Sequence, residues 1–343
     1  SYIEGDWETV RSNLEDYDIL IGSGPAPVFV NRIGRQLDIL QPFGGDVTEL
    51  SRFEFINYGA PLISWQNLKL QLARFKYVQD YRAGVAGTKH LFLIEDYFMP
   101  FISECGFTGE RHRFLVPMVY VEADHRRKSL TENFPVLSHS DLIRSFQKKK
   151  SPIVFHHPRH VWTSGSDPIS NKGNDRLIRG FADFVHKHPE LSPVLITCEY
   201  GEDVNESKQL IEECRISDNV VWLPLMPRAE ILQIISLVDI GTNNFCIGWF
   251  VCGTILEVLA YGVPLMSARD DWRAEGQFNE VYSSINVSTP EEISAALDDF
   301  VKRPDYYKEM GNKGREWFQK YCVDLPVDAF VDVIETCDNS TKG

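Results

Sequence analysis

The sequence has no long apolar run and no excess of basic residues. No apolar stretch approaches the roughly 18 residues of a membrane-spanning helix, and residues 1–6 lack the basic and apolar regions of a signal peptide. The chain has 35 Lys and Arg against 49 Asp and Glu, a net charge of −14. So acidic a surface repels phosphate backbones, which argues against nucleic acid as a partner. We therefore expect a cytoplasmic protein.

Patterned cysteines and common catalytic motifs are absent as well. The seven cysteines are scattered without a C-x-x-C pair, which fits buried thiols in a reducing compartment better than a disulfide framework. The sequence lacks a P-loop, a G-x-S-x-G and an H-E-x-x-H motif. Gly22-Ser-Gly24 has no third glycine of a dinucleotide fingerprint, and Asp16-Tyr-Asp18 matches only a three-residue metal motif that is common by chance. None of these motifs indicates what the chain does.

Lysine and arginine do cluster in two places, at Arg126-Arg-Lys128 and Lys148-Lys-Lys150. Such runs are typical of a solvated face, and they also suit contact with an anionic membrane. Both interpretations stay open, so peripheral membrane association is one expectation for this protein.

Short apolar runs alternate with amphipathic helical patterns over the 343 residues, a length that suggests two domains. Strand–helix alternation predicts parallel sheets covered by helices on both faces. Thr289-Pro-Glu-Glu292 is a strong helix start with a capping box, and a boundary is expected near residues 140–152. The predicted strands are 19–21, 37–41, 90–94, 114–116, 153–155, 194–197, 220–223, 239–240 and 263–266.

The first candidate site is His156-His-Pro-Arg-His160, at the end of a predicted strand. Ligands of open parallel sheets bind beyond the carboxyl ends of the strands, so Arg159 is placed to meet an anion. Lys172 opens a predicted helix, and free N–H groups at a helix start also favour an anion. Together they would hold a diphosphate without a metal, although both could be ordinary surface charges. Zinc binding by His156 and His160 would need a helix, which a strand end does not supply.

The second candidate site is the segment from Trp249 to Pro264, in which a glycine-containing loop precedes an apolar helix. Glu257 is the one carboxylate of that helix, and a carboxylate in an apolar setting needs a hydrogen-bonding partner. Sugar hydroxyls are suitable donors, and a core Arg or a backbone N–H would serve equally well.

These residues carry a family resemblance over residues 151–321. The sequence shows Lys172-Gly before a helix, then Val220-Val-Trp-Leu-Pro224, Val238-Asp-Ile240 and Leu256-Glu-Val-Leu-Ala-Tyr-Gly-Val-Pro264. In that order and with those gaps, they resemble the retaining glycosyltransferases of the GT-B fold in family 4. Tyr17-Asp-Ile-Leu-Ile21, Phe43-Gly-Gly-Asp46 and Phe107 to Pro117 are similar, more loosely, to parts of that family's N-terminal domain.

The resemblance implies an α/β, GT-B architecture of two Rossmann-like domains whose parallel sheets face each other across a cleft. Residues 1–150 would form a reduced or truncated acceptor-side domain and 151–321 the domain that binds the nucleotide-sugar donor. Residues 322–343 would form a C-terminal helix and tail that packs back on the N-terminal domain.

The resemblance also assigns site residues. Arg159 and Lys172 would bind the diphosphate and stabilise its charge, Glu257 would bind the ribose, and Asp46 would replace a histidine that the family often has at position 44. Trp249 stands where the family has the first acid of its E-x₇-E signature, so it either stacks on the sugar or fills core space. The backbone around Trp222 and Leu223 would contact the base, and the loop Phe250 to Thr254 would lie against the sugar and its phosphates. The implied donor-binding set is Arg159, Lys172, Trp222, Leu223, Trp249, Phe250, Val251, Cys252, Gly253, Thr254 and Glu257.

The implied activity is transfer of a hexose from a UDP- or GDP-linked donor to a hydroxyl of a glycan, glycolipid or polysaccharide. The reaction would retain the anomeric configuration and use no metal and no cofactor besides the donor itself. A catalytically silent sugar-nucleotide binder or partner subunit is the alternative, because Trp249 replaces an acid. A nucleotide-sugar epimerase of similar fold is a third option.

Overall fold

The computed structural model describes residues 6–52, 65–115, 117–118, 140–148, 151–163 and 170–341. The chain forms two compact units. Unit 1 combines Ser1–Pro117 with Tyr321–Gly343, and unit 2 is Met118–Lys320. The chain therefore returns to unit 1 within the π-helical segment η6 (Gln319–Asp324).

Unit 1 is built on a four-stranded parallel sheet of very short strands. Their order is β1 (Ile21–Gly22), β2 (Ile39–Leu40), β3 (His90–Phe92) and β4 (Glu110–His112). The helices of the unit are α1 (Trp7–Glu15), α2 (Ala26–Arg32), α3 (Gly45–Leu50), α4 (Trp65–Ala86), η2 (Asp96–Phe98), α5 (Met99–Glu104) and α14 (Leu325–Thr341).

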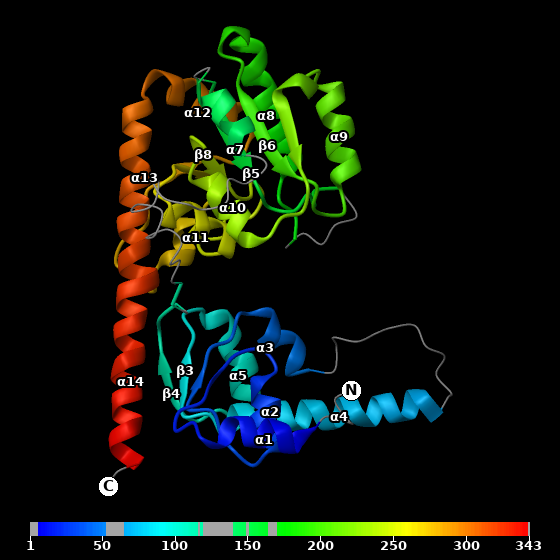
Figure 1. The fold of residues 1–343 in the computed structure, drawn as a ribbon, viewed down its shortest axis with the longest axis vertical. Helices are drawn as coiled ribbons and strands as arrows, with labels where there is room; N and C mark the ends of the chain where they lie inside the picture. The colour runs from blue at the N-terminus through cyan, green and yellow to red at the C-terminus, as the bar shows by residue number, and fades with distance from the viewer. Residues whose placement is uncertain are drawn as a thin grey trace. The chain divides into compact units, whose positions relative to one another are not determined.

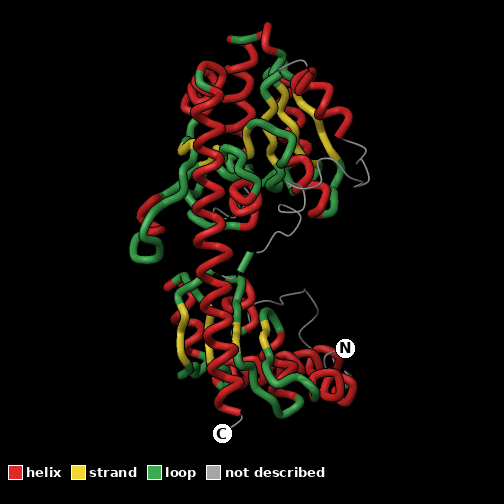
Figure 2. Tube along the Cα trace, turned by 60° about the vertical axis from the view of Figure 1, so that its left-hand side comes forward, coloured by secondary structure: helices red, strands yellow, loops and turns green. Residues whose placement is uncertain are grey.

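Helix α14 covers one face of this sheet, as both views show (Figures 1 and 2). Phe330 and Val333 of α14 form a buried cluster with Ile39 and Phe92, and the rings of Phe92 and Phe330 are 4.0 Å apart. On α4, a side chain at Gly84 would lie 2.1 Å from the carbonyl oxygen of Pro27, so glycine allows the close packing of α4 on α2. The C-terminal helix is therefore part of the core of unit 1.

Unit 2 contains a six-stranded parallel sheet in the order β10-β9-β8-β5-β6-β7. From β5 the chain adds β6 and β7 on one side, then returns to add β8, β9 and β10 on the other, which is the doubly wound Rossmann order. The strands are β5 (Ile153–His156), β6 (Val194–Cys198), β7 (Val220–Leu223), β8 (Ile240–Thr242), β9 (Leu265–Ser267) and β10 (Ile285–Asn286).

Helices flank this sheet, and α8 packs against α12 (Figure 1). Gly180 permits that contact, because a Cβ there would lie 2.6 Å from the carbonyl oxygen of Pro290. Thr289 and Glu292 form the expected capping box at the start of α12. The helices are α7 (Ser140–Lys148), α8 (Asn174–Lys187), η3 (Pro189–Leu191), α9 (Val204–Glu213), η4 (Ser217–Asn219), α10 (Arg228–Ile235), α11 (Gly253–Ala260), η5 (Asp271–Ala274), α12 (Pro290–Lys302) and α13 (Pro304–Phe318).

One predicted strand is wrong. Residues 114–116 were expected to form a strand, whereas the fourth strand of unit 1 is Glu110–His112 and residues 113–115 follow it without regular structure. The polar segment Glu110–His112 pairs in parallel register with β3. Phe114 lies beyond this pairing and packs beside the cluster of Phe92 and Phe330. Of the two basic runs, only Lys148 lies within the described residues, at the end of α7. Among the helices described, none is long and apolar enough to cross a membrane.

Candidate functional site at the carboxyl ends of β5 and β8

The candidate site lies where the strand order of unit 2 reverses, between β5 and β8. Open α/β sheets bind ligands outside the carboxyl ends of the strands at such a switch point. The segment after β5 supplies His157 and Arg159, and the segment after β8 supplies Asn243. Lys172 lies just before the first residue of α8, and Glu257 belongs to α11.

The loop after β5 is held by a buried hydrogen-bond chain. Asn174 donates to Nε2 of His156 at 2.8 Å, so Nδ1 of that ring carries the proton and donates to Thr242 at 2.8 Å. His160 lies 2.8 Å from both Ser207 and Thr197. Both ring nitrogens of both histidines are therefore occupied, and the structure offers no zinc site at His156 and His160.

Burial keeps these two rings neutral. It lowers the pKa of His160 to about 4, and it holds the pKa of His156 well below the usual value, with further lowering from the neighbouring histidines and Lys172. Asp203 fixes the rest of the loop by accepting from the amides of Trp162 and Thr163 at 2.6 and 2.9 Å. The loop that presents Arg159 is thus rigidly anchored to the sheet.

Lys172 has the properties expected of an anion-binding residue. Within the described part of the chain, no hydrogen-bond or ion-pair partner of its ammonium group is found. Burial lowers the pKa of Lys172; Cys252 acts in the opposite direction, and the positive charge of Arg159 lowers the pKa further. Arg159 is exposed and donates to Ser170 at 3.3 Å. The role of these two cations toward a diphosphate stays a prediction.

The amino-terminal end of α8 is open on the same side. Its N-cap residue is Gly173, in the left-handed conformation with φ 64°, and no side chain caps the helix. A side chain at this position would lie 3.0–3.1 Å from Cys246 and Phe245. Glycine thus lets the turn pack closely, and no side chain among the described residues competes for the start of α8.

Glu257 is buried and already has two partners. His157 donates from Nε2 to one carboxylate oxygen at 2.9 Å, and Arg228 lies 2.9 Å from the other. An arginine partner of Glu257 is therefore present, but it is not the core arginine that sequence reasoning left open, because the side chain of Arg228 is 54% exposed. Each oxygen can accept a second hydrogen bond, so the pair orients Glu257 and leaves it able to bind a hydroxyl.

Three buried polar atoms near Glu257 lack a hydrogen-bond partner among the described residues: Nδ1 of His157 and the amide nitrogens of Asn243 and Asn244. The other end of Asn243 is used, because Thr254 donates to its oxygen at 2.6 Å. Buried polar atoms without partners are rare. Others, such as those of Ser51, Arg74 and Tyr81, belong to unit 1, but the three that follow β5 and β8 lie at the switch point, where open sheets bind ligands.

The loop that begins α11 contains both core and open positions. Phe250 is 4% exposed and packs against Phe278, Tyr282 and Trp317, and its carbonyl accepts from Tyr282 at 2.8 Å. Its side chain is therefore part of the core. By contrast, no atom lies within 4 Å of a Cβ built on Gly253, and Val251 and Cys252 are half-buried.

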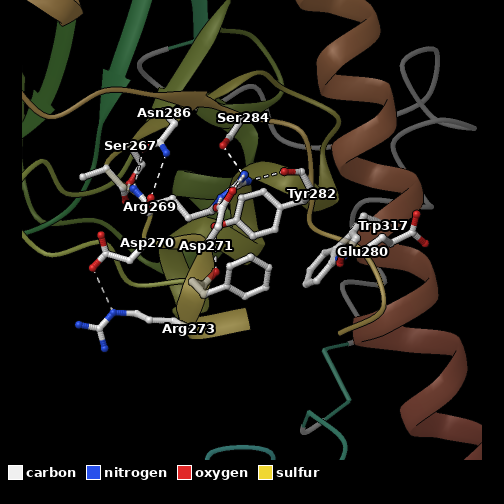
Figure 3. A network of polar contacts seen from close by, with 12 residues as sticks. Ser267, Arg269, Asp270, Asp271, Arg273, Glu280, Tyr282, Ser284, Asn286 and Trp317 are labelled. Atoms are coloured by element: carbon white, nitrogen blue, oxygen red, sulfur yellow. Dashed lines mark hydrogen bonds and ion pairs between the residues drawn. The ribbon is translucent and has the colours of Figure 1, made fainter. Parts of the chain in front are cut away.

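A polar network after β9 supports this loop (Figure 3). Arg269 pairs with Asp271 at 2.5 Å, donates to Ser284 at 2.9 Å and lies over the ring of Tyr282 at 4.6 Å. Its backbone exchanges two hydrogen bonds with the side chain of Asn286 at 2.8 and 2.9 Å. Because Tyr282 bonds to Phe250, the network positions the start of α11.

Trp249 is half-buried, and the guanidinium of Arg273 lies 4.9 Å from its ring centroid. Arg273 also lies 4.5 Å from the ring of Trp272, which is 61% exposed. Trp249 therefore takes part in a cation–π contact in place of the carboxylate that the resembled family has there.

The two residues expected near the base lie in β7. Leu223 is buried, and Trp222 is half-buried with its ring 5.0 Å from that of His160. Lys208 lies over Trp222 at 5.2 Å. Only the backbone of these residues was expected to meet the base, and that expectation stays a prediction.

Asp46 belongs to unit 1, where its carboxylate organises two glycine-containing loops. One oxygen accepts from Gly24 at 2.9 Å, and the other accepts from Phe43 and Val47 at 2.9 and 3.0 Å. Gly44 has φ +97°, and a Cβ there would lie 2.9 Å from Phe98. The turn therefore requires glycine where the resembled family often has histidine, and a role of Asp46 toward a sugar rests on the resemblance alone.

Sequence reasoning missed His157, Arg228 and Asn243. His157 was visible within the histidine cluster, and its position directly after β5 was the signal that could have found it. Arg228 and Asn243 follow β7 and β8, at the same edge of the sheet, but single polar residues after strands are too common to be singled out from sequence.

The sequence matches no protein-family model, and no curated protein matches it. The fold does match solved structures. HepE of Anabaena in complex with UDP-glucose has a TM-score of 0.54 and 13% identity, over 97% of this chain and 82% of that one. Sucrose-phosphate synthase of Thermosynechococcus elongatus gives 0.56 and 10%, over 97% and 77%. The UDP-forming α,α-trehalose-phosphate synthase of Burkholderia xenovorans gives 0.57 and 11%, over 98% and 78%.

These similarities show the fold of the chain. It has the two-unit α/β architecture of GT-B glycosyltransferases, as the sequence predicts. The finer assignment to family 4 stays a prediction.

Proposed function

We propose that this protein is a glycosyltransferase that moves a hexose from a nucleoside-diphosphate sugar to a hydroxyl acceptor. One observation supports this most strongly. Lys172 is half-buried with no partner of its ammonium group among the described residues, and atoms of His157, Asn243 and Asn244 that lack a partner there lie at the same switch point. A half-buried ammonium without a counter-charge is unfavourable, and a bound diphosphate would neutralise it.

In this proposal, Arg159 and Lys172 bind the two phosphates together with the open end of α8. The bond from the anomeric carbon to the diphosphate oxygen breaks while the acceptor oxygen forms a bond to that carbon and loses its proton. Charge develops on the departing diphosphate, and the two cations stabilise it more in the transition state than in the bound donor. Retention of configuration and independence from metal are further parts of the proposal, drawn from the family resemblance.

Glu257 would bind the ribose hydroxyls, since Arg228 and His157 hold it in one orientation. The backbone of Trp222 and Leu223 would meet the base. The segment Val251, Cys252, Gly253 and Thr254 would face the sugar and phosphates, and for Phe250 only its backbone is available. Uridine is the base we propose first, because HepE and the trehalose-phosphate synthase are described with UDP or UDP-glucose.

Calorimetric titration with UDP, GDP and their glucose conjugates tests the proposal. Lys172→Ala should weaken binding of the preferred diphosphate by about 1.5–3 kcal/mol, roughly 10- to 150-fold, because it removes a charge-assisted contact. Arg159→Ala should have a similar effect. The matched control is Lys308→Ala, which removes a lysine of α13 outside the site. Unchanged affinity in both site variants would refute the site.

Transfer activity separates the enzyme from a silent binder. Trp249 favours the alternative, because an indole cannot accept hydrogen bonds from sugar hydroxyls as a carboxylate does. Tight binding without transfer or donor hydrolysis, across a panel of carbohydrate and lipid-linked acceptors, would identify a sugar-nucleotide-binding protein or partner subunit.

The location of the protein is also part of the proposal. We place it in the cytoplasm, where its seven free cysteines would stay reduced. Contact with an anionic membrane through the basic runs would bring it to a lipid-linked acceptor.

A further inference from the structure

Two histidines and a glutamate meet on the sheet of unit 1, and none of the three is a residue of the proposed donor site. His90 pairs with Glu110 in the β3–β4 register, and Phe92 pairs with His112. Alternate residues of a strand share a face, so His90, Glu110 and His112 lie on the face to which Phe92 belongs. That face is the one covered by α14, because Phe92 packs against Phe330.

The ligating atoms of these three side chains converge on one point. Nδ1 of His90 lies 3.1 Å from Nε2 of His112, and one carboxylate oxygen of Glu110 lies 3.7 and 3.9 Å from the same two nitrogens. Ligands about 2.0–2.1 Å from a tetrahedral zinc ion lie roughly 3.3 Å apart. The three atoms are therefore spaced closely enough to share one ion after small side-chain adjustments.

The cluster opens into a cavity of about 430 Å³ between the sheet and α14. Asp328 and Asp332 of α14 line this cavity with the three residues of the cluster. The two aspartates are four residues apart and so share one face of the helix. The imidazoles are largely buried, with side chains 16% exposed, whereas Glu110 is 68% exposed. The ligand atoms of His90, Glu110 and His112 all lie within 4.8 Å of one another, and neither aspartate belongs to that group, so one of the two would have to turn toward the cluster to complete a site.

We propose that His90, Glu110 and His112 bind a zinc ion, with Asp328 or Asp332 as the fourth ligand. Two imidazoles and two carboxylates suit zinc better than magnesium or calcium, which prefer oxygen ligands alone. The ion would connect β3 and β4 to the C-terminal helix and would stabilise unit 1. This site is independent of the donor site and of the proposed transfer reaction.

No local sequence pattern indicates this site. His90 and His112 are 22 residues apart, and no short motif relates them. They meet only because β3 and β4 pair in a parallel register that places position 112 two residues beyond the partner of His90. The zinc alternative raised for His156 and His160 concerned a different place, where both rings are already occupied.

The site is tested by titrating the metal-free full chain with Co²⁺, whose visible absorption reports tetrahedral coordination, followed by competition with Zn²⁺. The expected result is one Co²⁺ per chain, displaced by Zn²⁺. His90→Gln, His112→Gln and Glu110→Gln should each weaken binding by on the order of 100-fold or more, beyond the effect of losing an outer-shell partner. The matched control is His186→Gln, which removes an exposed histidine of α8 and should leave binding unchanged.

Two outcomes would overturn the proposal: no tetrahedral Co²⁺ spectrum with the wild type, or the same affinity in the wild type and the three variants. Glu110→Gln keeps the test valid if a histidine variant fails to fold, because Glu110 is largely exposed. The fourth ligand is tested by Asp328→Asn and Asp332→Asn. Unchanged affinity in both would remove α14 from the site and leave the ion on the sheet alone.

Discussion

The two units differ in how some of the polar groups beside their sheets are paired. In unit 1, Asp46 accepts from three backbone amides, and Asp38 accepts from the amide of Leu20 at 2.8 Å and pairs with Lys89 at 2.7 Å. In unit 2, Lys172 and the free nitrogens of His157 and Asn243 have no such partners among the residues described. Unit 1 also has buried atoms without a partner, in Ser51, Arg74 and Tyr81, but only in unit 2 do such atoms directly follow β5 and β8 at the switch point, where a polar ligand of an open sheet binds.

The largest expected effect tests whether the two units are separate folding units. Phe181 is fully buried in the core of unit 2, and Phe181→Ala should lower the free energy of unfolding by about 3–5 kcal/mol. Urea unfolding followed by tryptophan fluorescence reports mainly on unit 2, which contains Trp162, Trp222, Trp249, Trp272 and Trp317, whereas Trp7 and Trp65 belong to unit 1. Phe92→Ala in unit 1 is the control. An equal shift of this transition by both variants would show that the chain unfolds as one body.

Acid should destabilise unit 2 through His160. An unfolded histidine gains a proton below about pH 6.5, whereas folded His160 stays neutral down to a pKa of about 4. The unfolded state therefore binds more protons between these values, and stability falls as the pH decreases through this window. By pH 5 the loss from His160 should be roughly 2 kcal/mol.

Urea midpoints at pH 7 and pH 5 measure this loss. His160→Gln should make the difference smaller, whereas the exposed His186→Gln should leave it as it is in the wild type. A wild type that is equally stable at both pH values would contradict the buried, neutral state of His160.

Glu257→Gln tests the ribose role within the donor site. A neutral amide accepts hydrogen bonds less well than a carboxylate, so UDP affinity should fall by about 1–2 kcal/mol. Pyrophosphate contains no ribose and is the control ligand, since its affinity should stay the same. If calorimetry shows that Glu257→Gln lowers the affinities for UDP and pyrophosphate equally, Glu257 only holds Arg228 and His157 in place.

Trp249→Ala tests whether the indole stacks on the hexose. The affinity for UDP-glucose should fall by about 1 kcal/mol while that for UDP changes little, because only the conjugate contains the sugar. Trp272→Ala is a matched control, because Arg273 lies over that ring as well. If Trp249→Ala lowers the affinities for UDP and for UDP-glucose equally, the role of Trp249 is structural.

The smallest expected effect is that of added divalent metal on transfer. The proposed diphosphate site uses Arg159 and Lys172, and no acidic cluster for a hard cation is found among the described residues of unit 2. Mg²⁺ or Mn²⁺ added to a transfer assay should therefore leave the rate unchanged. A severalfold stimulation would contradict the metal-independent mechanism, whatever the state of the zinc site in unit 1.

Periodicity and motif order predicted most of unit 2. The strand at 220–223 and the capping box at Thr289 are confirmed, because these segments pack into one regular sheet and local pattern agrees with tertiary structure. Unit 1 was harder to predict. Its strands are only two or three residues long, so pairing register, which has no local sequence signal, decides where each one lies.

The candidate site shows the same division. Arg159 and Lys172 could be singled out because a motif surrounds them, whereas the partners of Glu257 come from segments 29 and 100 residues away in the chain. Contacts between distant segments depend on the topology of the sheet. They became visible only when the order of β5, β7 and β8 was known.

The turn at Gly44 also constrains how this protein could have diverged. A histidine at that position would need both a left-handed backbone that side chains rarely adopt and space now filled by Phe98. A single substitution would therefore be selected against, unless a smaller residue at position 98 and a relaxed turn had arisen first. A histidine at this turn would thus depend on earlier changes at position 98 and in the backbone, so the order of mutations would matter as well as their identity.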